Sequence, residues 1–138
     1  MTDNLIARLK AGLDEDERVA LEAKTGYPGL CYHDKTGRWG FDGIGVGDEN
    51  GEAVVEDHGS HPEITPHIAR HDPARVLRWV KAAREILDEH RASDSPHANG
   101  DRSCLGCGAG SDGEMLVADV NDCPVLCALA SVYGDEET

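Results

Sequence analysis

Long apolar segments are absent from this sequence of 138 residues. No run approaches the roughly 20 consecutive apolar residues that a membrane-spanning helix needs. The first ten residues, MTDNLIARLK, also lack the apolar stretch of a secretory signal peptide. These two absences exclude a membrane-embedded protein and lead us to expect a soluble protein of the cytoplasm.

Aromatic side chains are few, with one Phe, two Trp and three Tyr, and 16 glycines dilute the apolar content further. A chain of this length can bury a core, but this composition makes a lean one. A bound metal or another cross-link would therefore add useful stability. The length favours a single domain over residues 1–138.

Basic side chains are also scarce, since 13 Lys and Arg face 27 Asp and Glu, for a formal charge of −14. Binding to nucleic acid needs clustered Lys and Arg, so we expect no direct contact with it. A strongly acidic surface is typical of a highly soluble protein, or of one that binds a basic surface on a partner protein. Mimicry of DNA is a third interpretation, and it would need carboxylates spaced along one face like phosphates.

Residues 4–24 are predicted to form an amphipathic packing helix. Leu5, Leu9 and Leu13 are spaced by four and therefore share one face, while the acidic run LDEDER supplies a solvated face. The glycine and proline that follow are typical of a helix end.

A central helix is predicted to begin where Asp72 precedes Pro73. An Asp side chain can accept a bond from a free N–H of the first turn, and proline at the first position loses no hydrogen bond. Apolar residues then recur at steps of four and three. They are Val76, Val80, Ala83 and Leu87. His90 ends this inward stripe and is its only polar member.

Between these two predicted helices, the spacing of apolar residues changes from a helical period to the alternation typical of strands. We expect two antiparallel strands, at about 38–46 and 53–57, because Asn50 and Gly51 make a good hairpin turn. The fold class predicted is therefore α+β: a small three-helix domain with a short antiparallel hairpin or sheet.

Four histidines and an aspartate fall between residues 58 and 72. One hypothesis is that they form the site of a metal-dependent hydrolase. No His-Glu-x-x-His motif is present, and Pro62 and Pro66 are expected to break the segment into short turns. Surface histidines are the favoured interpretation. The residues are His58, His61, His67, His71 and Asp72.

The sharpest chemistry lies in the cysteines of residues 104–134, where we expect a zinc knuckle followed by a C-terminal helix. Two residues separate Cys104 from Cys107, and after 15 more come Cys123 and then Cys127. This spacing predicts a tetrahedral zinc site whose ligands all come from the protein, which is typical of structural zinc. Thiol redox chemistry is the alternative, but the strand-then-helix context that lowers a thiol pKa is missing.

The fourth ligand has two candidates. Cys127 has suitable spacing, whereas His90 ends the core-facing stripe of the central helix just before the knuckle. Cys31 is far from the others in sequence and is the natural unpaired cysteine. Residues 92–103 are rich in Ser, Asn, Asp, Gly and Pro and predict a flexible loop. An acidic tail is expected at 134–138.

Several stretches resemble a family of short uncharacterised proteins from actinobacteria and their phages. They are LDEDER, HIARHDPARVL, ILDEH, and Cys-Pro-x-Leu with Ala-Leu-Ala and a tyrosine after it. This chain departs from the family in its TGYPGL stretch, where the family has Thr-Pro-Gly-Pro-Trp. The family also tends to carry Arg at the position of Cys127, which favours His90 as the shared fourth ligand. The resemblance implies no known activity, but it does imply a phage or prophage accessory gene.

Together these features predict structural zinc on Cys104, Cys107, Cys123 and His90, with Cys127 as the competing fourth ligand. We expect a binding protein and no enzyme: an acidic regulator or inhibitor of a host or phage protein, such as transcription or defence machinery. Its working surface would be an acidic patch with exposed Trp39 or Phe41 as an aromatic anchor. The metal-dependent hydrolase and the DNA mimic are the alternatives.

Overall fold

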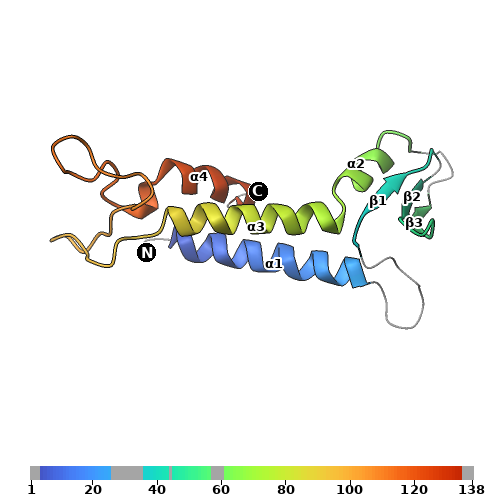
Figure 1. Ribbon diagram of the computed structural model, residues 1–138, viewed down its shortest axis with the longest axis horizontal. Coiled ribbons are helices and arrows are strands. Elements are labelled where there is room, and N and C mark those ends of the chain that lie inside the picture. The colour runs from blue at the N-terminus through green and yellow to red at the C-terminus, as the bar shows by residue number, and fades with distance from the viewer. Residues whose placement is uncertain (1–3, 26–35, 44, 57–60, 135–138) are drawn as a thin grey trace. The chain divides into compact units, whose positions relative to one another are not determined.

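The computed structural model describes residues 4–25, 36–43, 45–56 and 61–134. These parts form an α+β structure with four α-helices and a three-stranded antiparallel sheet (Figure 1). Contacts within the chain divide it into two compact units. The first comprises residues 1–14 and 81–138, and the second residues 15–80. The prediction of a single domain stays a prediction.

Each of the two long helices is divided between the units, with about half of its residues in each. They are α1, Leu5–Thr25, and α3, Pro73–Glu89. Their bounds agree closely with the helices predicted from the leucine spacing and from the start at Asp72. None of the helices in the described part of the chain has both the length and the apolar character needed to cross a bilayer.

The sheet belongs to the second unit and has the strand order β1 (Trp39–Phe41), β2 (Gly45–Asp48) and β3 (Ala53–Glu56). The prediction of one strand over 38–46 is wrong, because a tight turn divides it. Asp42 makes this turn: its side chain accepts the Gly45 N–H at 2.8 Å, and its own N–H donates to the Gly45 carbonyl at 3.2 Å. The predicted turn at Asn50 and Gly51 joins β2 to β3, with Gly51 at φ 79°.

A short helix, α2 (Thr65–Arg70), packs against β1 and β2 in the second unit. The expectation that prolines reduce this segment to short turns is therefore wrong over these residues. Pro66 lies in the first turn of α2, where its missing N–H removes no helical hydrogen bond. The described fold thus has four α-helices where three were expected.

Asp72 both caps α3 and attaches it to the sheet. One carboxylate oxygen accepts the Arg75 N–H at 2.7 Å, as the sequence predicts for a helix cap. The other accepts the backbone N–H of Trp39 at 3.1 Å, so the same side chain places β1 beside the start of α3.

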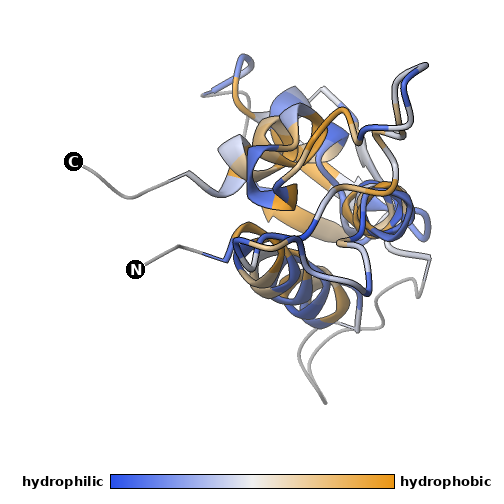
Figure 2. Ribbon diagram, turned by 90° about the vertical axis from the view of Figure 1, so that its left-hand side faces the viewer, coloured by the Kyte–Doolittle hydropathy of each residue, from blue (hydrophilic) through white to orange (hydrophobic). Residues whose placement is uncertain are grey.

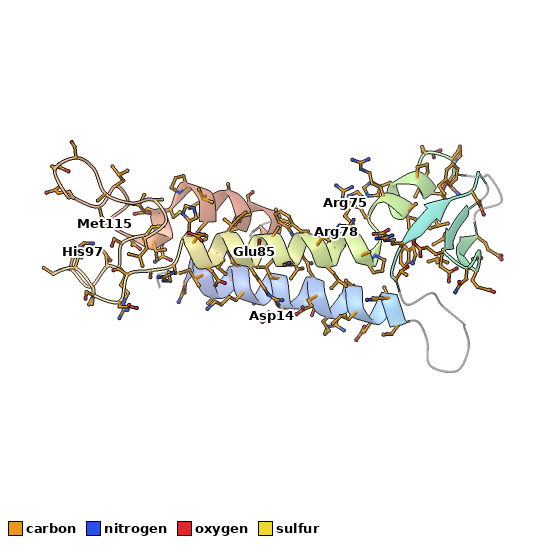
Figure 3. The ribbon with its side chains drawn as sticks, viewed as in Figure 1. Asp14, Arg75, Arg78, Glu85, His97 and Met115 are labelled. Atoms are coloured by element: carbon orange, nitrogen blue, oxygen red, sulfur yellow. The ribbon has the colours of Figure 1, made fainter. Side chains whose placement is uncertain are left out.

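In the first unit, α4 (Pro124–Ala130) lies between two short 3₁₀ helices, η1 (Val120–Asp122) and η2 (Ser131–Tyr133). Leu5, Leu9 and Leu13 of α1 are buried there, and Figure 2 shows the alternation of apolar and polar residues along α1. The Asn121 side chain accepts the Leu5 N–H at 3.1 Å and so ties η1 to the start of α1. Across the same unit, Asp14 (labelled in Figure 3) pairs with Arg84 of α3 at 2.8 Å.

Candidate metal centre

Three segments of the first unit supply the side chains of the candidate centre. His90 directly follows the last residue of α3, and its N–H still donates to the Ile86 carbonyl at 3.0 Å. Cys104 and Cys107 lie on the knuckle, residues 104–108, and Cys123 is the N-cap of α4. In Figure 1 the end of α3 and the start of α4 lie at the same end of this unit, beside the loops that carry the knuckle.

The four ligand atoms lie within 4.8 Å of one another. The His90 Nδ1 atom is 3.4 Å from the Cys104 sulfur, 3.7 Å from Cys107 and 3.5 Å from Cys123. The sulfurs of Cys107 and Cys123 are 3.7 Å apart, too far for a disulfide, and all three cysteines are free.

These separations can be compared with the edges of a zinc tetrahedron. Zn–S bonds of about 2.3 Å and Zn–N bonds of about 2.0–2.1 Å give edges of about 3.8 Å between sulfurs and about 3.6 Å between sulfur and nitrogen. The four distances in the structure, 3.4–3.7 Å, are close to these values. The cluster therefore has the size and the donor atoms to hold one metal ion.

Glycines allow the knuckle to approach His90. A Cβ on Gly106 would lie 2.6 Å from the Glu89 carbonyl oxygen and 2.8 Å from Nδ1 of His90, so no side chain fits there. Gly108 has φ 73°, a conformation that favours glycine, and its N–H closes the turn onto the Leu105 carbonyl at 3.2 Å. The two glycines thus have different roles: one permits a close approach, and the other a turn.

The thiol of Cys123, at the start of α4, has a lowered pKa. Burial raises the pKa of the Cys123 thiol, but bonds from the N–H groups of Leu126 and Val125 and from the other two thiols lower it more, so the pKa is lowered on balance. Such stabilisation of a thiolate is expected at a helix N-terminus.

Cys107 behaves in the opposite way. Desolvation, followed by its hydrogen bonds to Cys104 and Cys123 and their charges, raises its pKa to about 12. Three thiols this close cannot all ionise without a cation among them, and a bound dication would reverse the preference by stabilising every thiolate.

Cys127 lies outside the cluster. Its side chain is exposed, and its thiol donates to the Asn121 carbonyl at 3.4 Å. One helical turn after Cys123, it points away from the ligand set that its spacing suggested. Cys31 lies outside the described residues.

The histidine-rich segment has a different organisation. The rings of His67 and His71 lie against each other, with centroids 4.2 Å apart and planes tilted by 36°, and His71 Nδ1 donates to the His67 carbonyl at 2.8 Å. Both Asp72 oxygens accept backbone N–H groups. Within the described residues, the only group of three or more potential ligands is the one at His90; His61 is described but belongs to no such group, and His58 lies outside the description.

Fold and site together define an α+β protein with a candidate metal centre of three cysteines and one histidine. Comparison with known families shows more: the chain belongs to a family of unknown function, DUF6221, whose model matches residues 2–136. The prediction of an uncharacterised family is thereby confirmed, whereas the actinobacterial or phage origin stays a prediction. No curated protein and no solved structure matches the chain.

Sequence reasoning overlooked how strongly the approach to His90 depends on Gly106. Its signal was present, since a Gly inside a Cys-x-x-Cys pair often marks a close backbone contact. Asn121 was also missed as the acceptor of the Leu5 N–H at the start of α1, because the two residues are 116 positions apart and no local pattern links them.

Proposed function

We propose that the protein binds one structural zinc ion through Cys104, Cys107, Cys123 and His90, and that it acts by binding another protein. The observation that carries this proposal is the ligand set itself. Three sulfurs and one nitrogen would fill all four positions of a tetrahedral zinc ion, which would leave no position for a substrate or a reactive water.

The donor atoms favour zinc over other metals. Thiolate and imidazole ligands select zinc or iron–sulfur chemistry, whereas calcium and magnesium prefer oxygen. The sulfurs of Cys104 and Cys123 are fully buried, so the ion would be shielded from water. In a chain with so few aromatic side chains, its binding free energy would hold α3, the knuckle and α4 together.

The charge of the chain supports a binding role. With a formal charge of −14, the surface would attract a basic surface on a partner and disfavour nucleic acid. Phe41 is 42% exposed on β1 and would serve as an aromatic anchor at such an interface. The narrower proposal is a phage or prophage regulator that inhibits host transcription or defence machinery. It rests on the family resemblance and the acidity of the chain.

A hydrolase at the histidine-rich segment has less support. The carboxylate assigned to this site, Asp72, accepts two backbone N–H groups, one in the first turn of α3 and one on β1. Its two oxygens thus already have a structural role, which accounts for the presence of Asp72 without a catalytic one.

Metal analysis by mass spectrometry tests the first half of the proposal. Protein purified without a histidine tag should carry one zinc per chain. The zinc should be lost in Cys123→Ser, much weakened in His90→Ala, and retained in Cys127→Ser, which is the matched control because Cys127 lies outside the cluster. A metal-free protein in freshly reduced preparations, or loss of zinc in Cys127→Ser, would contradict the assignment.

Selection from a random peptide library on the immobilised zinc-loaded protein tests the second half. We expect the enriched peptides to be basic and to contain aliphatic or aromatic residues. Absence of any enrichment, or enrichment of acidic peptides, would count against an acidic binding surface.

A further inference from the structure

A half-open pocket of about 290 Å³ lies within the second unit, between the second half of α1, β1 and the start of α3. This volume is at the lower limit of typical ligand pockets, so it suits one side chain better than a drug-sized molecule. Its walls are mostly apolar. They are formed by Val19, Ala20, Ala23, Trp39, Pro73 and Val76.

Hydrogen bonds hold the backbone of one aromatic wall residue, Trp39, and the ring of the other, His71. The backbone N–H of Trp39 donates to the Asp72 carboxylate at 3.1 Å. His71, which also lines the pocket, donates from Nδ1 to the His67 carbonyl at 2.8 Å. Since the backbone of Trp39 and the ring of His71 are held in this way, a ligand would meet a partly pre-formed site.

The charge around the pocket is acidic. Asp16 lies in its wall, and the α1 segment from Glu15 to Glu22 carries four carboxylates and one arginine. That arginine, Arg18, is shared between Glu15 and Glu22 at 2.7 and 2.6 Å. A cation entering the pocket would therefore meet favourable potential from the helix beside it.

Exposed apolar side chains of α1 lie at the rim of the pocket and beside it. Val19 is 49% exposed at the pocket, and Leu21, which does not line the pocket, is 45% exposed. An amphipathic partner would cover this apolar surface while its charges meet the carboxylates.

We propose that this pocket receives a lysine or arginine side chain from a basic segment of a partner protein. The aliphatic stem would pack on Val19, Ala20 and Val76, and the cationic head would lie near Asp16 and the face of Trp39. This inference rests on the proposed binding function and names the partner chemistry of one site.

The test uses a fluorescein-labelled peptide of alternating Lys and Leu, with a Glu and Leu peptide for comparison, in fluorescence anisotropy at low ionic strength. Two variants of the full chain form a matched pair: Val19→Arg at the rim and Leu21→Arg outside the pocket. Both add the same charge to exposed positions of one helix, and arginine is a good helix former, so α1 should persist. Thermal unfolding of each variant checks this.

We expect Val19→Arg to weaken binding of the Lys and Leu peptide by at least about tenfold, because its own guanidinium competes for the pocket. Leu21→Arg should weaken it by no more than about twofold to threefold, through charge alone. In a Trp79→Phe background, which leaves Trp39 as the sole tryptophan of the sequence, bound peptide should also shift the tryptophan emission.

Equal losses in the two variants, or no loss in either, would overturn the pocket assignment and leave the acidic binding surface standing. A wild-type protein that binds the Lys and Leu peptide no better than the Glu and Leu peptide would overturn the pocket and the proposed basic partner together.

Discussion

Replacing Gly106 with alanine should open the metal centre without removing any of its four ligands. A Cβ at this position would lie 2.6 Å from the Glu89 carbonyl oxygen and 2.8 Å from Cγ and Nδ1 of His90. Ordinary contact begins near 3.4 Å, so the knuckle and the end of α3 must separate by about 0.6–0.8 Å.

Metal sites tolerate far less than this, since ligand distances must stay within about 0.2 Å of their ideal values. We therefore expect His90 to be displaced or strained, and zinc affinity to fall by about 10–100-fold, as for other changes that misplace a ligand. The strain should also cost about 1–3 kcal/mol of unfolding free energy in the zinc-loaded protein.

Competition with a chromogenic zinc chelator measures the affinity, and thermal unfolding measures the stability. Gly113→Ala is the control: this glycine has φ 82° with open space around it, so alanine there should cost about 1–2 kcal/mol of backbone strain without changing zinc affinity. An unchanged zinc affinity in Gly106→Ala would refute the packing argument.

Three further predictions address proton linkage, capping and packing. Because the pKa of Cys107 is raised to about 12, its thiol holds a proton at neutral pH that zinc must displace. The affinity for zinc should therefore rise with pH. Calorimetry in two buffers of different ionisation heat should detect the released protons. Asp72→Ala removes the cap of α3 and the bond to Trp39, so we expect a loss of about 1–3 kcal/mol in denaturant unfolding with zinc content unchanged. Gly12→Ala should destabilise the wild type, because its Cβ would lie 2.5 Å from the Tyr133 ring, yet stabilise a Tyr133→Ala background by about 0.8–1 kcal/mol through helix propensity. The same sign in both backgrounds would contradict the contact with Tyr133.

Local patterns predicted the parts of the fold that depend on local chemistry. The start of α3 followed from Asp72 and Pro73, and the turn at Gly51 followed from its preference for positive φ. The grouping of His90 with the cysteines followed from helix periodicity, which placed it at the end of the inward stripe of α3.

Features that depend on distant partners were missed. The break in the first strand depends on how Asp42 bonds to Gly45, where the sequence predicted one strand over 38–46. The helix α2 is supported by its packing against β1 and β2, and Pro66 falls in its first turn, where it removes no helical hydrogen bond. The position of Cys127 could not be decided from spacing, since one turn of helix carries its thiol away from Cys123 to the Asn121 carbonyl.

X-ray absorption at the zinc edge tests the central claim most directly, because it reports the ligand atoms themselves. The account predicts a first shell of three sulfurs at about 2.3 Å and one nitrogen at about 2.0–2.1 Å, with the imidazole signal lost in His90→Ala. A shell of four sulfurs would replace His90 with Cys127, and a shell containing water or carboxylate oxygen would contradict the closed structural site.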